Sequence, residues 1–367
     1  MANLVWSDVI PRMPPQTETD AEIVAPELLA WWDANGRKDM AWQQNPTRYR
    51  VWVSEVMLQQ TQVTTVAPYY DRFMAEFPTV MDLAAAEPDR VLHLWSGLGY
   101  YARARNLHKA ASLITDQYDG ELPDNIDALL SLPGIGRSTA GAILALADDC
   151  RHPILDGNAK RVYARFFAIA GWPGQGAVLK TLWAIAEACT PATGAAIYTQ
   201  AIMDLGATVC LRLNPRCGHC PLADSCLARR QNLLDSIPGK RPKRKKPQRK
   251  TVLVVAVRDD GAVLLQKRPD TGIWGGLWCF PETDGVARVA EWCFATVGQL
   301  PGELQVRPVI RHSFTHFDLD MTPVEARLPA IDARLMDGDG WLWYKRAAPA
   351  AVGLAAPVAR LLESIGE

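Results

Sequence analysis

A strongly basic stretch at residues 237–250 constrains the fold of this chain more than any other feature. It reads IPGKRPKRKKPQRK, with eight Lys or Arg residues and no acidic residue. So much charge, with three prolines and almost no apolar side chains, favours an extended linker over a packed segment. The 367 residues are therefore predicted to form two cores, one before this stretch and one after it.

The net charge of the whole chain conceals this segment. With 39 basic and 40 acidic residues the total is −1, so without the eight positive charges of the linker the rest carries −9. The total excludes a polycation that grips nucleic acid with its whole surface, but it permits a local basic patch. Contact with a DNA backbone is the favoured role of the linker, and solubility is the alternative. The linker has no Cys or His, so no zinc site is expected there.

Nothing in the sequence indicates a membrane or a secretory route. No run of 18 or more apolar residues is present, and residues 1–20 lack a basic region followed by an apolar one. We therefore expect an intracellular, cytoplasmic protein without a membrane partner. In that compartment its eight cysteines should be reduced or bound to metal rather than paired as disulfides.

The region before the linker has the pattern of an all-α domain. Pro26 followed by ELLAWWDAN and Gly36 predicts a helix that begins at the proline and ends before the glycine. Other segments have helical length and few breakers: 50–66, 103–117, 137–147, 158–170 and 194–206. No strand-like alternation stands out among them.

The region after the linker is predicted to be an α/β or α+β domain of about 115 residues. The runs TVLVVAV and AVLLQKR flank Asp259-Asp260-Gly261, which indicates a β-hairpin. AAPVARLLESI near the C-terminus predicts a helix. Further strand candidates are 305–310, 313–320 and 323–328.

Four cysteines follow the pattern C-x6-C-x2-C-x5-C: Cys210, Cys217, Cys220 and Cys226. Four thiolates this close in sequence are suited to one tetrahedral Zn²⁺ or to one [4Fe–4S] cluster, and their number alone does not distinguish the two. Arginines flank the loop on both sides, and they form either a solvated face or a phosphate-contacting surface: Arg212, Arg216, Arg229 and Arg230.

A glycine-rich turn, Leu132-Pro133-Gly134-Ile135-Gly136, separates two predicted helices. Glycines let the backbone approach another molecule closely, and the N–H groups at the start of the next helix, near Ser138, suit an anion such as a DNA phosphate. The alternative is an ordinary turn between two helices.

Two carboxyl groups stand out. Asp156 lies twenty residues after Gly136, where the alternative role is that of a helix N-cap. Glu55 has three apolar residues among its four neighbours on the same helical face, which predicts partial burial and a raised pKa. A carboxyl group with a raised pKa is suited to general acid catalysis near neutral pH.

Together, the glycine turn, the aspartate and the four-cysteine loop resemble the helix-hairpin-helix DNA glycosylases of the endonuclease III superfamily. The motifs VWVSEVMLQQT at 51–61, GLGYYARA at 97–104 and DGNAKR at 156–161 narrow the resemblance to the adenine DNA glycosylases of the MutY family. The resemblance runs from about residue 25 to near the C-terminus.

The resemblance implies a multidomain protein. An N-terminal extension (1–24) precedes an all-α, two-lobed helix-hairpin-helix glycosylase domain (25–232), whose loop at 210–226 binds a [4Fe–4S] cluster. An interdomain linker (233–250) leads to a Nudix-like α/β domain (251–367), related to MutT, that recognises 8-oxoguanine. The implied function is to flip out and remove adenine opposite 8-oxoguanine or guanine in double-stranded DNA. The resemblance also implies a monomer that is associated with the nucleoid.

The resemblance also assigns roles to single residues. Glu55 protonates the adenine, Asp156 stabilises the positive sugar and Asn158 holds the sugar or a water molecule. The residues implied to contact DNA near the mispair or at the hairpin are Gln59, Gln60, Tyr100, Leu132, Gly134, Gly136 and Ser138.

In the second domain, Phe314, Thr315 and His316 resemble the loop that reads 8-oxoguanine, with Thr315 where the family usually has serine. The alternative for this stretch is a half-buried strand.

Ser138 stands where bifunctional relatives carry lysine, whose amine forms a Schiff base with the sugar. Serine has no such chemistry, and Lys160 lies one helical turn beyond Asp156, so no efficient lyase activity is expected. Three alternatives are an endonuclease III-like glycosylase/lyase for oxidised pyrimidines, a noncatalytic DNA-binding iron–sulfur protein and a Nudix pyrophosphatase. The last is disfavoured, because VARVAEWCFATVG offers only Glu291 where Mg²⁺-binding acids are needed.

Overall fold

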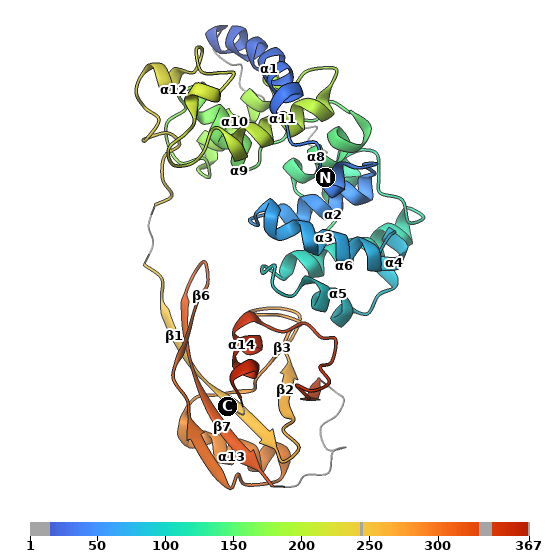
Figure 1. Cartoon of the computed structure of the whole chain (residues 1–367), viewed down its shortest axis with the longest axis vertical. Helices are drawn as coiled ribbons and strands as arrows, with labels where there is room; N and C mark the ends of the chain where they lie inside the picture. Colours follow the sequence, from blue (N-terminus) through green and yellow to red (C-terminus); the bar gives the residue numbers. More distant parts are fainter. Residues whose placement is uncertain (1–14, 243–244, 330–339, 366–367) are drawn as a thin grey trace, which may run out of the picture. The chain divides into compact units, whose positions relative to one another are not determined.

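A computed structural model describes residues 15–242, 245–329 and 340–365, which form two compact units (Figure 1). The helical unit comprises residues 15–84 and 109–242, and the sheet unit comprises residues 85–108 and 245–365. Within these ranges, no helix combines the length and the apolar character needed to cross a bilayer.

Twelve α-helices precede the basic segment in the described residues. Their bounds are α1 (Pro15–Asn35), α2 (Arg48–Leu58), α3 (Val63–Glu76), α4 (Val80–Ala85), α5 (Pro88–Trp95), α6 (Ala102–Gln117), α7 (Ile126–Ser131), α8 (Arg137–Asp148), α9 (Gly157–Phe166), α10 (Gly176–Cys189), α11 (Ala195–Thr208) and α12 (Leu227–Arg230).

The core of the helical unit lies where α1 and α9–α11 meet. Leu28, Tyr163, Leu182 and Leu205 are at most 1% exposed there, and each buried side chain of this size stabilises the fold by about 1.5–3 kcal/mol. Helix α8 packs on both α2 and α11. It therefore joins the helix that carries Glu55 to this core.

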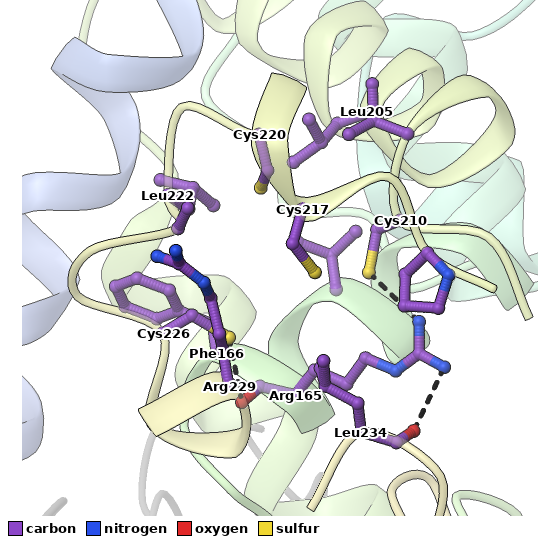
Figure 2. A pocket seen from close by; sticks show the side chains of 14 residues that line it. Arg165, Phe166, Leu205, Cys210, Cys217, Cys220, Leu222, Cys226, Arg229 and Leu234 are labelled. Carbon is purple, nitrogen blue, oxygen red and sulfur yellow. Dashed lines mark hydrogen bonds between the residues drawn. The ribbon is translucent and has the colours of Figure 1, made fainter. Parts of the chain in front are cut away.

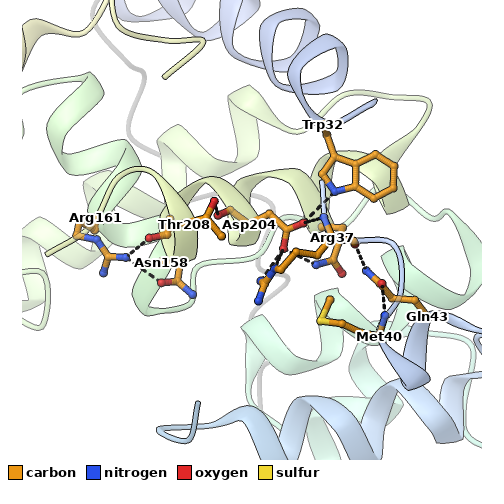
Figure 3. Close-up of polar contacts among 10 residues, drawn as sticks. Trp32, Arg37, Met40, Gln43, Asn158, Arg161, Asp204 and Thr208 are labelled. Atoms are coloured by element: carbon orange, nitrogen blue, oxygen red, sulfur yellow. Dashed lines mark hydrogen bonds and ion pairs between the residues drawn. The ribbon is translucent and has the colours of Figure 1, made fainter. Parts of the chain in front are cut away.

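A buried carboxylate ties the N-terminal segment to α11 (Figure 3). Asp204 is 1% exposed and accepts hydrogen bonds from Trp32 Nε1 at 3.1 Å and from Gln200 Nε2 at 2.9 Å. Arg37 donates to the same carboxylate from its backbone N and from Nε, each at 2.9 Å, and from Nη2 at 2.6 Å. The charge of Asp204 is thus paired and hydrogen-bonded, as a buried charge requires.

Two expectations about helix boundaries were wrong. Pro26 lies inside α1 and does not begin it, because burial of Ala21, Val24 and Leu28 outweighs the hydrogen bond that the proline removes. The predicted helix at 50–66 is two helices. The break falls at Gln59–Gln62, where Gln60 has φ +62°, a left-handed conformation that a helix does not contain.

From Gln248 onward, the described residues of the sheet unit form eight strands and two α-helices. They are β1 (Gln248–Arg258), β2 (Val263–Lys267), β3 (Trp278–Cys279), β4 (Glu282–Thr283), α13 (Val289–Val297), β5 (Glu303–Val306), β6 (Ile310–Ser313), β7 (Asp318–Leu328), β8 (Trp341–Tyr344) and α14 (Ala356–Ser364).

The central strands β1 and β7 run parallel, and the sheet order is β3-β2-β1-β7-β5. The predicted hairpin is confirmed, because β1 pairs antiparallel with β2. β1 has five consecutive buried residues, 252–256, as in a strand covered on both faces. On one face Val254 and Ala256 pack against Val289 and Cys293 of α13.

The basic segment packs at both ends, which its composition did not predict. Ile237 is 4% exposed and its carbonyl accepts a hydrogen bond from Arg165 Nε at 2.9 Å. The Arg241 guanidinium lies 5.6 Å from the centroid of Trp172, and β1 begins at Gln248. The number of charges does not describe the backbone groups and the long side-chain stems, which can pack while the charged ends stay in solvent. Residues 243–244 lie outside the described part of the chain, as do residues 1–14 of the expected N-terminal extension.

Candidate active site

Glu55 lies on α2, among buried residues of the same helix. The helix is N-capped by Thr47, and its residues Val51, Trp52 and Val56 are buried. Glu55 itself is partly buried. Desolvation by this environment raises the pKa of Glu55 to about 8, and the negative charge of Asp156 adds to the rise. The raised pKa expected from the sequence is confirmed, and the carboxyl group is mostly protonated at pH 7.

Asp156 is the N-cap of α9. Its Oδ1 accepts a hydrogen bond from the backbone N of Ala159 at 2.7 Å, so the structural role weighed from the sequence is confirmed. The carboxylate is partly buried and its charge acts on Glu55. The helical unit thus brings together the two carboxyl groups singled out in the sequence, one mostly protonated and one that caps a helix.

The glycine turn has the conformation that its sequence predicts. Gly134 has φ +82°, which disfavours a side chain, and Gly136 is the N-cap of α8. Both glycines are exposed, whereas the side chain of Leu132 is 4% exposed and belongs to the core. The backbone of this turn is therefore the part that is available to a ligand.

Ser138 makes a contact that the sequence did not reveal. Its Oγ accepts a hydrogen bond from the backbone N of Leu155 at 3.0 Å. The serine thereby links the start of α8 to the residue just before Asp156. A residue type that can accept this bond was visible in the sequence, but its partner seventeen residues away was not.

The residues expected at the mispair occupy two loops. Gln59 donates from Nε2 to Thr139 Oγ1 at 3.3 Å, and Gln60 is exposed. Tyr100, in the sheet unit, is 51% exposed with φ +49°. Its neighbour Tyr101 is 9% exposed and donates its hydroxyl to the carbonyl of Leu354 at 2.9 Å, so Tyr101 is a packing residue.

The side-chain oxygen of Asn158 is held by Arg161 (Figure 3). Its Oδ1 accepts from Arg161 Nη2 at 2.9 Å. Arg161 also donates to the carbonyls of Gly206 and Cys210, each at 2.6 Å. Gly206 must be glycine because a Cβ there would lie 2.5 Å from the Cβ of Asn158. Arg161 thus connects the first turn of α9, next to Asp156, to the first cysteine of the loop.

The four cysteines line one pocket (Figure 2): Cys210, Cys217, Cys220 and Cys226. Apolar side chains, among them Phe166 and Leu222, line the same pocket. Within the described residues, no group of three or more His, Cys, Asp or Glu side chains has the arrangement that one metal ion needs. Four thiols around one shared pocket are suited to an iron–sulfur cluster or to a zinc ion.

Arg165 is the second buried link between α9 and the cysteine loop. It is 3% exposed and donates from Nη1 to Cys210 Sγ at 3.4 Å (Figure 2). The same nitrogen also donates to the carbonyl of Leu211 at 2.6 Å. Its Nη2 reaches the carbonyls of Arg212 and Leu234. The sequence contains one signal for it: an arginine directly before Phe166-Phe167, on a helix whose residues are mostly buried.

In the sheet unit, residues 314–317 form the turn between β6 and β7 and not the strand considered as the alternative. The predicted single strand at 313–320 is therefore wrong. Phe314 N donates to the carbonyl of Phe317 at 2.9 Å, and the two rings stack with centroids 4.5 Å apart. Thr315 and His316 are exposed at the tip of the turn.

A second pocket in the sheet unit gathers more acids than the sequence suggested. Glu282 and Asp284 line it together with Glu291, Arg288 and Trp292. In the part of the chain that the structure describes, these acids do not form a set able to bind a metal ion.

The chain is similar to known proteins over nearly its whole length. Residues 53–188 match the HhH-GPD superfamily of base excision DNA repair proteins, and residues 252–364 match the NUDIX domain. The adenine DNA glycosylase of Buchnera aphidicola subsp. Acyrthosiphon pisum (strain APS) is 38% identical, over 92% of this chain and 96% of that protein. The adenine DNA glycosylase of Mus musculus is 33% identical, over 89% of this chain and 75% of that protein.

The fold of the helical part is also found among solved structures. A thermostable thymine-DNA glycosylase matches 59% of this chain and 99% of its own, with 25% identity and a TM-score of 0.53. The resemblance first drawn from short motifs is thereby confirmed by full-length similarity. With an HhH-GPD domain that contains Glu55 and Asp156 and a NUDIX domain after it, the chain belongs to the adenine DNA glycosylase family.

Proposed function

We propose that the chain hydrolyses the N-glycosidic bond of adenine in double-stranded DNA, as the first step of base excision repair. The observation that carries the proposal is the pair of carboxyl groups, in which Glu55 has a pKa of about 8 beside the charge of Asp156. A base inside a duplex must first be flipped out to reach such a pair.

Glu55 acts as the general acid. In its protonated form it donates its proton to the adenine ring nitrogen on the major-groove side, which makes adenine a better leaving group. The glycosidic bond breaks with its electron pair going to the base, and positive charge remains on the sugar. Asp156 stabilises that charge as a carboxylate. Water then adds to the anomeric carbon, and its proton goes to the carboxylate of Glu55.

Asn158 acts indirectly in this scheme. Its Oδ1 is engaged by Arg161, so its amide nitrogen is the group available to orient a water molecule or the sugar beside Asp156. The exposed backbone of the glycine turn, Gly134 and Gly136, binds a phosphate of the same strand through the N-terminus of α8. Gln59, Gln60 and Tyr100 support the opened stack.

The base opposite adenine is 8-oxoguanine or guanine, read by the turn that carries Phe314, Thr315 and His316. The exposed Thr315 hydroxyl supplies hydrogen bonding and Phe314 supplies a ring beside the lesion. The enzyme is a monomer. It has no efficient lyase activity, because Ser138 lacks the amine that forms a Schiff base.

The four-cysteine pocket binds a [4Fe–4S] cluster, with Cys210, Cys217, Cys220 and Cys226 as its ligands. The cluster supplies a covalent cross-link that fixes the loop. The N–H group that Arg165 directs at Cys210 Sγ suits a thiolate ligand, whose negative charge it stabilises. The arginines around the loop then form a fixed surface for DNA phosphates.

Single-turnover assays test the proposal with duplexes that contain adenine opposite 8-oxoguanine, adenine opposite guanine, or thymine glycol, each analysed with and without alkali. We expect adenine release from the first two and strand cleavage only after alkali. Release of thymine glycol, or efficient trapping of a protein–DNA adduct by borohydride, would instead assign the chain to the bifunctional branch. Absence of base release from every duplex would leave a DNA-binding protein.

A further inference from the structure

The last residues of the basic segment are attached to the hairpin β6–β7. Lys246 donates from Nζ to the carbonyl of Phe314 at 2.7 Å and to Ser313 Oγ at 3.1 Å, and it lies 3.8 Å from Asp318 Oδ1. Ser313 Oγ in turn donates to Asp318 Oδ1. The ammonium group therefore uses two of its three donors on the hairpin and faces a carboxylate there.

The three residues after Lys246 contact the same hairpin, and we name residues 246–249 the brace. The carbonyl of Pro247 accepts from the backbone N of Asp318 at 3.0 Å, and Gln248 Nε2 donates to Asp320 Oδ2 at 2.7 Å. The Arg249 guanidinium lies 4.6 Å from the centroid of Phe317, within the range of a cation–π interaction.

These contacts converge on the turn 314–317. The stack of Phe314 on Phe317 is covered by Arg249 on the Phe317 ring, and Trp274 lies 5.3 Å from the Phe314 ring. The carbonyl of Phe314 is anchored by Lys246. Thr315 and His316 are left exposed at the tip of a turn whose two ends are fixed.

We propose that the brace holds this turn in the conformation that reads the base opposite adenine, with Lys246 as a positioning residue for that reading. The inference rests on the proposed role of Phe314 and Thr315, and it assigns Lys246 a function other than gripping the DNA backbone. Loss of a lysine that binds phosphate would weaken the binding of all duplexes alike. Loss of a lysine that shapes the turn would instead alter the preference between opposing bases.

The test compares Lys246→Met, Lys246→Arg and Lys245→Met in the full-length protein. Lys245 is the matched control, because it carries the same charge one residue away and is exposed, without a hydrogen bond to the described residues. Single-turnover adenine release and DNA affinity are measured at two salt concentrations, with 8-oxoguanine or guanine opposite adenine. Hydrogen exchange of residues 313–318 is followed by mass spectrometry in the free protein.

We expect Lys246→Met to reduce the preference for 8-oxoguanine over guanine by about tenfold, the equivalent of one hydrogen bond to a charged donor. Hydrogen exchange at 313–318 should rise in the same variant. Lys246→Arg should retain most of the preference for 8-oxoguanine. Lys245→Met should leave both the preference and the exchange unchanged. Equal losses on both duplexes with a weaker salt dependence would make Lys246 a phosphate contact and overturn the proposal. If the wild type itself shows no preference, the proposed lesion reading fails, and unchanged exchange in Lys246→Met would then refute the brace separately.

Discussion

Replacing Glu55 by glutamine should stabilise the helical unit while abolishing activity. The pKa of Glu55 is about 8 in the folded protein and 4.5 in the unfolded chain. Folding therefore takes up a proton at pH values between the two. Keeping this group protonated at pH 7 costs about 1.4 kcal/mol for each unit that separates pH 7 from 4.5, or about 3 kcal/mol. Glutamine has almost the same shape and carries no proton to lose.

The sign of the effect follows from the direction of the shift. Because the pKa is raised, wild type and Glu55→Gln should be almost equally stable below pH 4.5. The advantage of the variant should grow as the pH rises and level off above pH 8, at about 5 kcal/mol. Base release by the wild type should fall over the same upper range, as the general acid loses its proton.

The assay is urea-dependent hydrogen exchange at pH 5, 7 and 9, read on peptides from α2 so that the helical unit is followed separately from the sheet unit. Glu55→Asp serves as a control that keeps a titratable carboxyl group. Adenine release by Glu55→Gln is measured in parallel and should fall by orders of magnitude. Equal stability of Glu55→Gln and wild type at all three pH values would refute the argument, because the carboxyl group would then not be desolvated.

Three further changes separate the other parts of the site. Asp156→Asn keeps an N-cap residue but removes the charge, so adenine release should fall by about 10²–10³-fold with the melting temperature nearly unchanged; loss of folding instead would make the residue only a cap. Ser138→Ala removes the acceptor for Leu155 N and should slow single-turnover release about two- to tenfold, whereas DNA affinity, measured by fluorescence anisotropy, should hold; the reverse pattern would indicate a direct DNA contact. Arg161→Gln leaves the carbonyls of Gly206 and Cys210 without this donor and should lower both the melting temperature and the rate, with iron content by absorbance as the control; an unchanged rate would show that α9 is positioned without it.

Local patterns predicted the parts of the site that depend on nearby residues. Glu55 was recognised because its helical neighbours at 51, 52 and 58 are apolar, and this spacing alone implied burial and a raised pKa. The turn at Gly134 and the hairpin between β1 and β2 likewise follow from glycine conformations and short-range periodicity. Such features are encoded within about ten residues, where helix and strand geometry fix the relative positions of side chains.

Contacts between distant segments were not predictable in the same way. The hydrogen bonds of Arg161 and Arg165 reach carbonyls 45–72 residues away, and backbone carbonyls leave no sequence signature. The packing of the basic segment was not predicted, because its charge count describes only its solvent-facing atoms. Its backbone joins β1, and Lys246 forms a hydrogen bond with a turn that is distant in the sequence. The start of α1 was missed because partners in α9–α11 stabilise a helix that contains Pro26.

The Arg37–Asp204 pair has a consequence for the order in which the protein folds. The two residues are 167 positions apart, so the carboxylate that Trp32 and Arg37 bind becomes available only after α11 has left the ribosome. Closing so long a loop costs conformational entropy before its contacts are gained, which makes this step slow compared with formation of the local helices. During synthesis the part of α1 that contacts α10 and α11 therefore stays uncovered until those two helices are made. The buried carboxylate on α11 thus completes the docking of α1 at a late stage of synthesis.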